Sequence, residues 1–146
     1  MDLSQAPAEI DSGREAWMQL FQLLQSGKRQ FQELAARFGL APIQVHLLLN
    51  LEVDRAGPMS EIAELLACDA SYVTNLVDRL EAKGLLERRL SPSDRRVKLI
   101  ALTEAGRQTK SEIMAMVSNP PPFIANMPEA DRDLLRDILV RAARTG

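Results

Sequence analysis

The sequence SEIAELLACDASYVTNLVDRLEAKG (residues 60–84) decides the fold, because it predicts two short helices joined by a very tight turn. Ser60 is a favoured N-cap residue for the first helix, SEIAELLA, and Asp69 is one for the second, ASYVTNLVDRLEAKG. Gly84 is placed to end the second helix. Two helices joined by so few residues cannot lie antiparallel and must cross steeply. The stretch therefore predicts a helix-turn-helix.

The second of these helices has one apolar and one polar face. Apolar residues recur at i, i+3, i+4 and i+7 and predict a buried stripe of Val73, Leu76, Val77 and Leu80. The opposite face carries Ser71, Tyr72, Thr74, Asn75, Asp78 and Arg79. Asparagine can pair with adenine edges, a threonine methyl can contact a thymine methyl, and arginine can bind guanine or phosphate. Because any surface helix is polar on its outer face, this face alone leaves open whether it binds DNA.

A β-hairpin is predicted directly after the helix-turn-helix. LLERRL (residues 85–90) and RVKLIAL (residues 96–102) alternate apolar and polar residues, as paired strands do, around a polar tip. The tip carries Asp94, Arg95 and Arg96, and Asp94 could pair with an arginine and set the shape of the loop. An arginine on such a tip can enter the neighbouring minor groove, where narrow A·T segments have a strongly negative potential.

The helix and hairpin together are locally basic, although the formal net charge of the chain is -2. Between positions 79 and 98 there are seven basic and three acidic residues: Arg79, Lys83, Arg88, Arg89, Arg95, Arg96 and Lys98, against Glu81, Glu87 and Asp94. A basic segment confined to one helix and the hairpin after it is the electrostatic footprint expected of a protein that contacts a phosphate backbone.

Two helices are predicted upstream of the helix-turn-helix. Apolar residues at three- and four-residue steps over positions 17–38 predict a long amphipathic helix, with a capping box at 12–15 and Gly39 at its end. A second helix starts at Pro42 and runs towards Asp54. The RAGP that follows is a turn signal.

Two further helices are predicted downstream. Thr103 caps the first, three prolines at 120–122 break it, and the last helix starts near Pro128. No linker is long enough to separate domains. The pattern as a whole predicts a mainly α fold with a small antiparallel β-hairpin.

Composition favours one globular domain, because 146 residues with 46% hydrophobic and 26% charged residues can bury a real core. Cys68 is the only cysteine, which rules out an intramolecular disulfide and fits a reducing compartment. The first residues, MDLSQAPAEIDSG, are acidic and do not resemble a signal peptide, and no apolar run is long enough to span a membrane. We therefore expect a cytoplasmic protein without membrane contact.

The segment MSEIAELLACDASYVTNLVDRLEAKGLLERRLSPSDRRVKLIALTEAGR (residues 59–107) resembles the winged helix-turn-helix of the MarR family of transcriptional regulators. The agreement includes LVDRLEAKGLLERR, the D-x-R of the hairpin tip and the LTEAGR that opens the next helix. The resemblance implies a single MarR-like domain over residues 1–146. Its DNA-binding region would span 42–102, flanked by dimerisation helices at 12–38 and 103–144.

The resemblance also implies roles for individual residues. Ser71, Tyr72, Thr74 and Asn75 would face the major groove. In the hairpin, which is the wing of the winged helix-turn-helix, Arg96 would enter the minor groove and Arg95 would lie near the DNA backbone. Asp94 would position the wing. Arg79 and Lys98 complete the expected DNA-binding set.

Members of the family are two-fold dimers joined by their terminal helices, so the resemblance implies a homodimer on a palindromic operator, with half-sites about one helical turn apart. The chain offers suitable apolar residues: Trp17, Phe21 and Leu24 in the first helix, and Leu135, Ile138 and Leu139 in the last. Some of these side chains are expected to close the monomer core instead. The resemblance further implies a repressor that a small effector releases from DNA.

No enzyme, cofactor or metal site is predicted. The sequence lacks a glycine-rich dinucleotide motif, a P-loop and an HExxH motif, and its single histidine, His46, leaves no catalytic triad and no metal site. His46 is expected to line a helix–helix interface. Cys68 can be a redox sensor or a small buried residue. The alternative function is a winged-helix module for protein interaction or ligand sensing that does not bind DNA.

Overall fold

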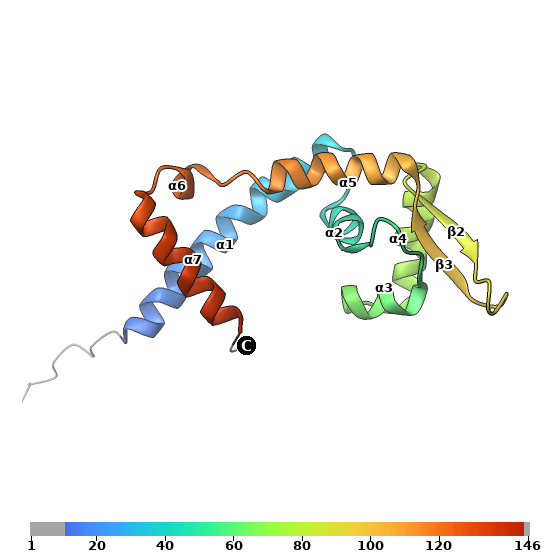
Figure 1. Ribbon diagram of the computed structural model, residues 1–146, viewed down its shortest axis with the longest axis horizontal. Helices are drawn as coiled ribbons and strands as arrows, with labels where there is room; N and C mark the ends of the chain where they lie inside the picture. The colour runs from blue at the N-terminus through green and yellow to red at the C-terminus, as the bar shows by residue number, and fades with distance from the viewer. Residues whose placement is uncertain (1–10, 145–146) are drawn as a thin grey trace, which may run out of the picture. The chain divides into compact units, whose positions relative to one another are not determined.

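The computed structural model describes residues 11–144, and Figure 1 shows a mainly helical chain with one small antiparallel sheet. The predicted fold class, a winged helix-turn-helix with helices before and after it, is confirmed. In chain order the elements are α1 (Ser12–Arg37), α2 (Pro42–Asn50), β1 (Gly57–Pro58), α3 (Met59–Leu66), α4 (Ala70–Ala82), β2 (Leu86–Leu90), β3 (Lys98–Leu102), α5 (Glu104–Val117), α6 (Pro122–Ala125) and α7 (Glu129–Ala143).

The chain divides into two compact units, and the boundary lies inside α5, between Lys110 and Ser111. The predicted single domain over 1–146 includes residues 1–10 and 145–146, which lie outside the described residues. The expectation that the first residues are not a signal peptide concerns mainly residues 1–10, which likewise lie outside the described residues. In the described part of the chain, no helix combines the length and the apolar character needed to cross a membrane.

The helix-turn-helix forms as predicted. Ala67 adopts a left-handed conformation (φ 48°) at the end of α3, and α4 follows after Cys68 and Asp69. The two helices pack against each other. The predicted stripe of α4 is buried, with exposed fractions between 0 and 5%: Val73, Leu76, Val77 and Leu80. The burial of this stripe leaves the polar face of α4 in solvent.

The hairpin pairs Leu86 with Leu102 at its base and Leu90 with Lys98 near its tip, and in Figure 1 it lies next to α4. A third strand, β1, is not predicted from the sequence, which assigns its two residues to the RAGP turn. Gly57 and Pro58 pair with β3 on the side away from β2. Two residues carry no alternation that a sequence could reveal, and proline is tolerated only because β1 is an edge strand.

Two of the predicted helix starts are wrong. The N-cap of α1 is Asp11, whose side chain accepts a hydrogen bond from the Gly13 N–H at 3.2 Å, so Ser12 is a helical residue and does not form a capping box. Ser60 lies inside α3, whose N-cap is Pro58 without a side-chain hydrogen bond. In both cases the helix begins before the predicted cap. Asp11 accepts a hydrogen bond from a free N–H group at the start of α1, whereas α3 begins without such a bond from its N-cap residue.

The end of α2 is also earlier than predicted: the helix stops at Asn50 rather than near Asp54. Lys110 of α5 donates from Nζ to the carbonyl oxygens of Leu49, at 2.9 Å, and Leu51. Arg107 donates from Nε to the carbonyl oxygen of Val53 at 3.1 Å. Cationic side chains of α5 thus donate hydrogen bonds to backbone carbonyl groups at and after the end of α2, some of which would accept intrahelical hydrogen bonds if α2 were longer.

The start of α5 is hydrogen-bonded to the turn between α4 and β2. Thr103 caps the helix as predicted, with Oγ1 accepting from the Gly106 N–H at 3.0 Å. The same hydroxyl donates to the carbonyl oxygen of Gly84 at 2.6 Å, and the Thr103 N–H donates to the carbonyl oxygen of Leu85 at 3.2 Å. Gly106 approaches Leu85 so closely that a Cβ at this position would lie 2.0 Å from the Leu85 oxygen.

The last part of the chain contains the predicted break and one helix that was not predicted. α5 ends at Val117, before the prolines, and α7 begins directly after Pro128. Between them Pro122 starts the short helix α6. Proline is favoured in the first turn of a helix, where its missing N–H is not needed. The proline run therefore both ends one helix and begins another.

Candidate nucleic-acid interface

The polar face of α4 is exposed along its whole length, including all the side chains predicted to face DNA: Ser71, Tyr72, Thr74, Asn75 and Arg79. The first turn of α4 is held by Asp69, which accepts hydrogen bonds from the Tyr72 N–H at 2.8 Å and from the Ser71 hydroxyl at 2.6 Å. The Thr74 hydroxyl donates to the carbonyl oxygen of Ala70 at 2.9 Å. Its methyl group and oxygen lone pairs therefore remain for a partner.

The carboxyl group of Asp69 has a lowered pKa, first because the Ser71 hydroxyl donates to its charged form and second because the Tyr72 N–H does. A lowered folded-state pKa stabilises the fold above the unfolded pKa of about 4, and this contribution is lost as the pH falls through the folded pKa. At neutral pH we expect a higher Tm for the wild type than for Asp69→Asn, which keeps a cap but does not titrate.

Thermal melts of both proteins from pH 7 to pH 3 test this expectation. The difference in Tm should stay constant down to about pH 5 and close below about pH 4, as the carboxylate takes up its proton. A difference that does not depend on pH would contradict the proposed role of the charged cap.

The hairpin tip is shaped by a side-chain-to-backbone hydrogen bond. Asp94 accepts from the backbone N–H of Arg96 at 3.0 Å, while the Val97 N–H donates to the Asp94 carbonyl oxygen at 3.0 Å. The expected side-chain pair between Asp94 and an arginine is absent from the ion pairs of residues 11–144. Arg95 and Arg96 are exposed at the tip, so this turn presents two cationic side chains to solvent.

Two of the seven cations counted in the sequence are paired within the protein. Arg88 forms ion pairs with Asp78 and Glu81 of α4, and Arg89 pairs with Glu87 of its own strand. The other five form no ion pair in the described part of the chain: Arg79, Lys83, Arg95, Arg96 and Lys98. The candidate interface is therefore less basic than the sequence count, and its available charges lie on α4 and near the hairpin tip.

A shallow depression joins the helix to the hairpin. Thr74 and Asp78 of α4 line it together with Arg88 of β2, Lys98 of β3 and Met59. It brings together two of the predicted DNA-binding residues, Thr74 and Lys98, that stand 24 positions apart in the chain. Ser71, Tyr72, Asn75 and Arg79 lie elsewhere on α4, and Arg95 and Arg96 lie at the tip.

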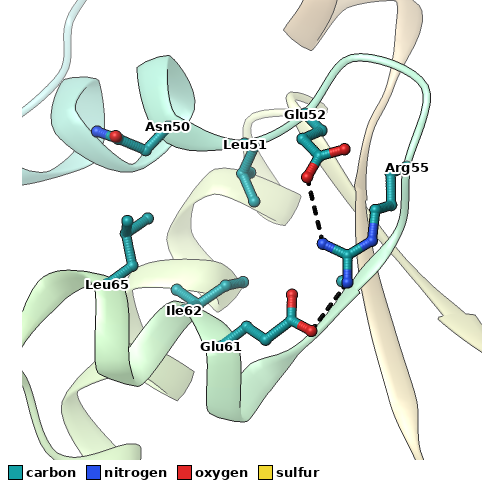
Figure 2. A pocket seen from close by; sticks show the side chains of 8 residues that line it. Asn50, Leu51, Glu52, Arg55, Glu61, Ile62 and Leu65 are labelled. Carbon is teal, nitrogen blue, oxygen red and sulfur yellow. Dashed lines mark hydrogen bonds and ion pairs between the residues drawn. The ribbon is translucent and has the colours of Figure 1, made fainter.

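A second cavity, of about 210 Å³, lies between the end of α2, β1 and α3. In Figure 2 Arg55 bridges Glu52, at 3.3 Å, and Glu61, at 2.9 Å, on one side of the cavity, and Leu51, Ile62 and Leu65 gather on the other. Hydrogen bonding and charge from Glu61 raise the pKa of Arg55 above its usual value. None of the predicted DNA-binding residues lines this cavity.

The two residues considered for redox or metal chemistry have ordinary surroundings. Cys68 is half-buried, and its thiol donates to the carbonyl oxygen of Leu66 at 3.2 Å. His46 is exposed on α2 rather than packed between helices of the single chain. Among residues 11–144 no group of three or more histidine, cysteine or acidic side chains could hold a metal ion.

Comparisons with known proteins support the same reading of the sequence. The model of the MarR family matches residues 40–98. A putative transcriptional regulatory protein for the hcr operon of Thauera aromatica is 34% identical over 118 residues, which cover 80% of this chain and 71% of the relative. The HTH-type transcriptional repressor MdtR of Bacillus subtilis is 35% identical over 96 residues; the match covers 66% of this chain and spans 60% of that relative.

A solved structure shows the same fold. A point mutant of MepR from S. aureus, bound to an oligodeoxyribonucleotide, superposes with a TM-score of 0.66 at 20% identity. The superposition covers 88% of this chain and 96% of that one.

Proposed function

This chain belongs to the MarR family, and we propose that it is a transcriptional regulator that binds double-stranded DNA in the cytoplasm. In this proposal α4 is the recognition helix and enters the major groove. The wing, which is the hairpin of β2, β3 and the tip at 91–97, reaches the adjacent minor groove with Arg96. The similar MepR mutant is bound to an oligodeoxyribonucleotide, which supports DNA binding by this chain by analogy.

One observation carries the proposal: the outer face of α4 and the base of the wing form a continuous surface. Thr74 and Lys98 line one depression, and the cations without an ion pair in residues 11–144 include Arg79 on the helix and Arg95 and Arg96 on the tip. A helix with short polar side chains beside a cationic loop can contact base edges and phosphates at once.

Selection from a randomised duplex library tests the proposal. The purified wild-type protein should enrich a palindromic sequence, and a gel shift should show tighter binding to that duplex than to a scrambled duplex of the same composition. Absence of enrichment would contradict DNA recognition. It would favour the alternative, a winged-helix module that senses ligands or binds proteins.

The proposal includes a homodimer, because a palindromic site requires a two-fold protein. Apolar side chains on α1 and α7 are strongly exposed in the single chain, among them Trp17 (57%), Leu24 (59%) and Leu139 (50%). Exposed apolar patches of this kind mark interaction surfaces. We expect light scattering at micromolar concentration to give twice the chain mass of 16.2 kDa. A monomeric mass would contradict the dimer.

The finer parts of the proposal concern regulation. As a repressor, the dimer would block transcription from its operator, and a small effector would bind to the dimer. The effector would release DNA by favouring a different spacing of the two recognition helices. A reporter gene placed behind the selected duplex tests the sign: deletion of the regulator should raise expression, and a fall in expression would identify an activator.

A further inference from the structure

Arg88 differs from the other cations of the wing in the direction of its side chain. In the hairpin register it pairs with Ile100, which is fully buried, while its neighbour Arg89 pairs with Leu99. Cross-strand partners project from the same face of a sheet, and successive residues project from opposite faces. Arg88 therefore lies on the face that turns towards the core and α4, and Arg89 lies on the other face.

Arg88 connects the wing to two turns of the recognition helix. Its guanidinium forms ion pairs with Asp78 through Nη2 and with Glu81 through Nη1. Its backbone N–H also donates to Glu81 at 3.2 Å. Asp78 and Glu81 stand three residues apart, so they lie on the same side of α4. One guanidinium, with its fixed fork of donors, can hold two carboxylates in a way that a lysine cannot.

The charges around Arg88 exclude it from the set of phosphate contacts. Two carboxylates surround one cation, so the cluster of Asp78, Glu81 and Arg88 is net negative and repels phosphate. Only 21% of the Arg88 side chain is exposed, compared with 53% for Arg89. Arg88, which the sequence count included in the basic segment, is thus engaged inside the protein.

We propose that Arg88 is a positioning residue that fixes the wing relative to the recognition helix. The inference rests on the proposed DNA-binding function. Asp78 and Arg88 line the same depression as Thr74 and Lys98, so the cluster lies between the residues assigned to the major groove and the base of the wing. Without it, the hairpin can change its angle to α4, and Arg96 then no longer reaches the minor groove when α4 is seated in the major groove.

A double-mutant cycle tests this coupling on the duplex selected by the wild-type protein. Arg96→Ala should weaken binding strongly in the wild type, but by less than about 2-fold in the Arg88→Met background, because the wing is already misplaced there. Arg89→Met is the matched control: in that background the full effect of Arg96→Ala should remain. Additive effects of Arg88→Met and Arg96→Ala, with a salt dependence reduced by about one ion for Arg88→Met, would identify Arg88 as a phosphate contact and overturn the proposal.

Glu81→Gln gives a second test in which the two explanations predict opposite signs. Removal of a negative charge beside DNA should tighten binding if long-range electrostatics alone acts at this position. If the carboxylate holds Arg88, the same substitution should weaken binding to the selected duplex several-fold. Tighter binding of Glu81→Gln would overturn the proposal.

A measurement without DNA separates the failure of this inference from the failure of the proposed function. Hydrogen exchange in the peptides covering 86–102 should be faster in Arg88→Met and Glu81→Gln than in the wild type, and unchanged in Arg89→Met. Thermal melts identify any variant that is globally unfolded, and Glu81→Gln is the milder change. If the wild type selects no duplex, the proposed function fails. Equal exchange rates in all the folded variants would overturn the positioning role of Arg88, whether or not the wild type selects a duplex.

Discussion

Gly106→Ala is expected to destabilise the protein by about 3 kcal/mol or more, the upper range for forcing an extra group into a packed site. A Cβ at this position would lie 2.0 Å from the carbonyl oxygen of Leu85 and 3.0 Å from its carbonyl carbon. These are backbone atoms, and the same oxygen accepts a hydrogen bond from the Thr103 N–H at 3.2 Å. The backbone at Gly106 and at Leu85 therefore cannot move apart without breaking the hydrogen bonds between the start of α5 and the α4–β2 turn.

The matched control for this substitution is Gly27→Ala in the middle of α1. Apart from the chain neighbours and the backbone of α1 itself, nothing lies within 4 Å of a Cβ at Gly27. Alanine is favoured over glycine in a helix, so this variant should gain roughly 0.5–1 kcal/mol. Urea unfolding of the three proteins gives the comparison. The same chemical change should thus have opposite signs in two helices, and similar stabilities of the two variants would contradict the close packing at Gly106.

Arg96→Ala is expected to weaken binding to the selected duplex by about 10-fold or more, the loss typical of one arginine contact worth about 1–3 kcal/mol. Arg96 forms no ion pair within residues 11–144, and only its backbone N–H is used, by Asp94. The alanine variant keeps that hydrogen bond, so its Tm should match the wild type. Fluorescence anisotropy with a labelled duplex gives the affinities.

Arg89→Ala serves as the control for Arg96→Ala, since it removes the same side chain from the same hairpin. Arg89 is already paired with Glu87 and lies on the outer face of β2, so its loss should change the affinity by less than about 2-fold. Equal losses for the two variants would show that the wing contributes only its total charge and that Arg96 has no particular position in the complex.

The parts of the fold that could be predicted from sequence are those in which local pattern and burial agree. The stripe of α4 repeats at helical spacing, Asp69 is a strong cap, and both appear in the structure as expected. Both predicted hairpin strands also form, although β3 buries three consecutive residues, Ile100, Ala101 and Leu102, and so does not alternate in burial. Local periodicity decides α4 because this helix buries one face against its immediate neighbours.

The parts that could not be predicted depend on residues distant in sequence. Lys110 and Arg107 end α2 from 54 to 61 positions away, and β1 exists only because β3 pairs with it. In the candidate interface, the roles of Arg88 and Arg89 depend on which hairpin face meets α4. A count of charges along the chain treats both as available for phosphate, although both are paired with carboxylates.

The salt dependence of wild-type binding to the selected duplex tests the central claim, that α4 and the wing form a DNA-binding surface. Four cations of that surface, Arg79, Arg95, Arg96 and Lys98, form no ion pair within residues 11–144, and a dimer doubles their number. The affinity should therefore fall by about 100-fold or more between roughly 50 and 200 mM salt, with tighter binding to the selected than to a scrambled duplex throughout. An affinity that does not change with salt, or that is equal for the two duplexes, would contradict the claim.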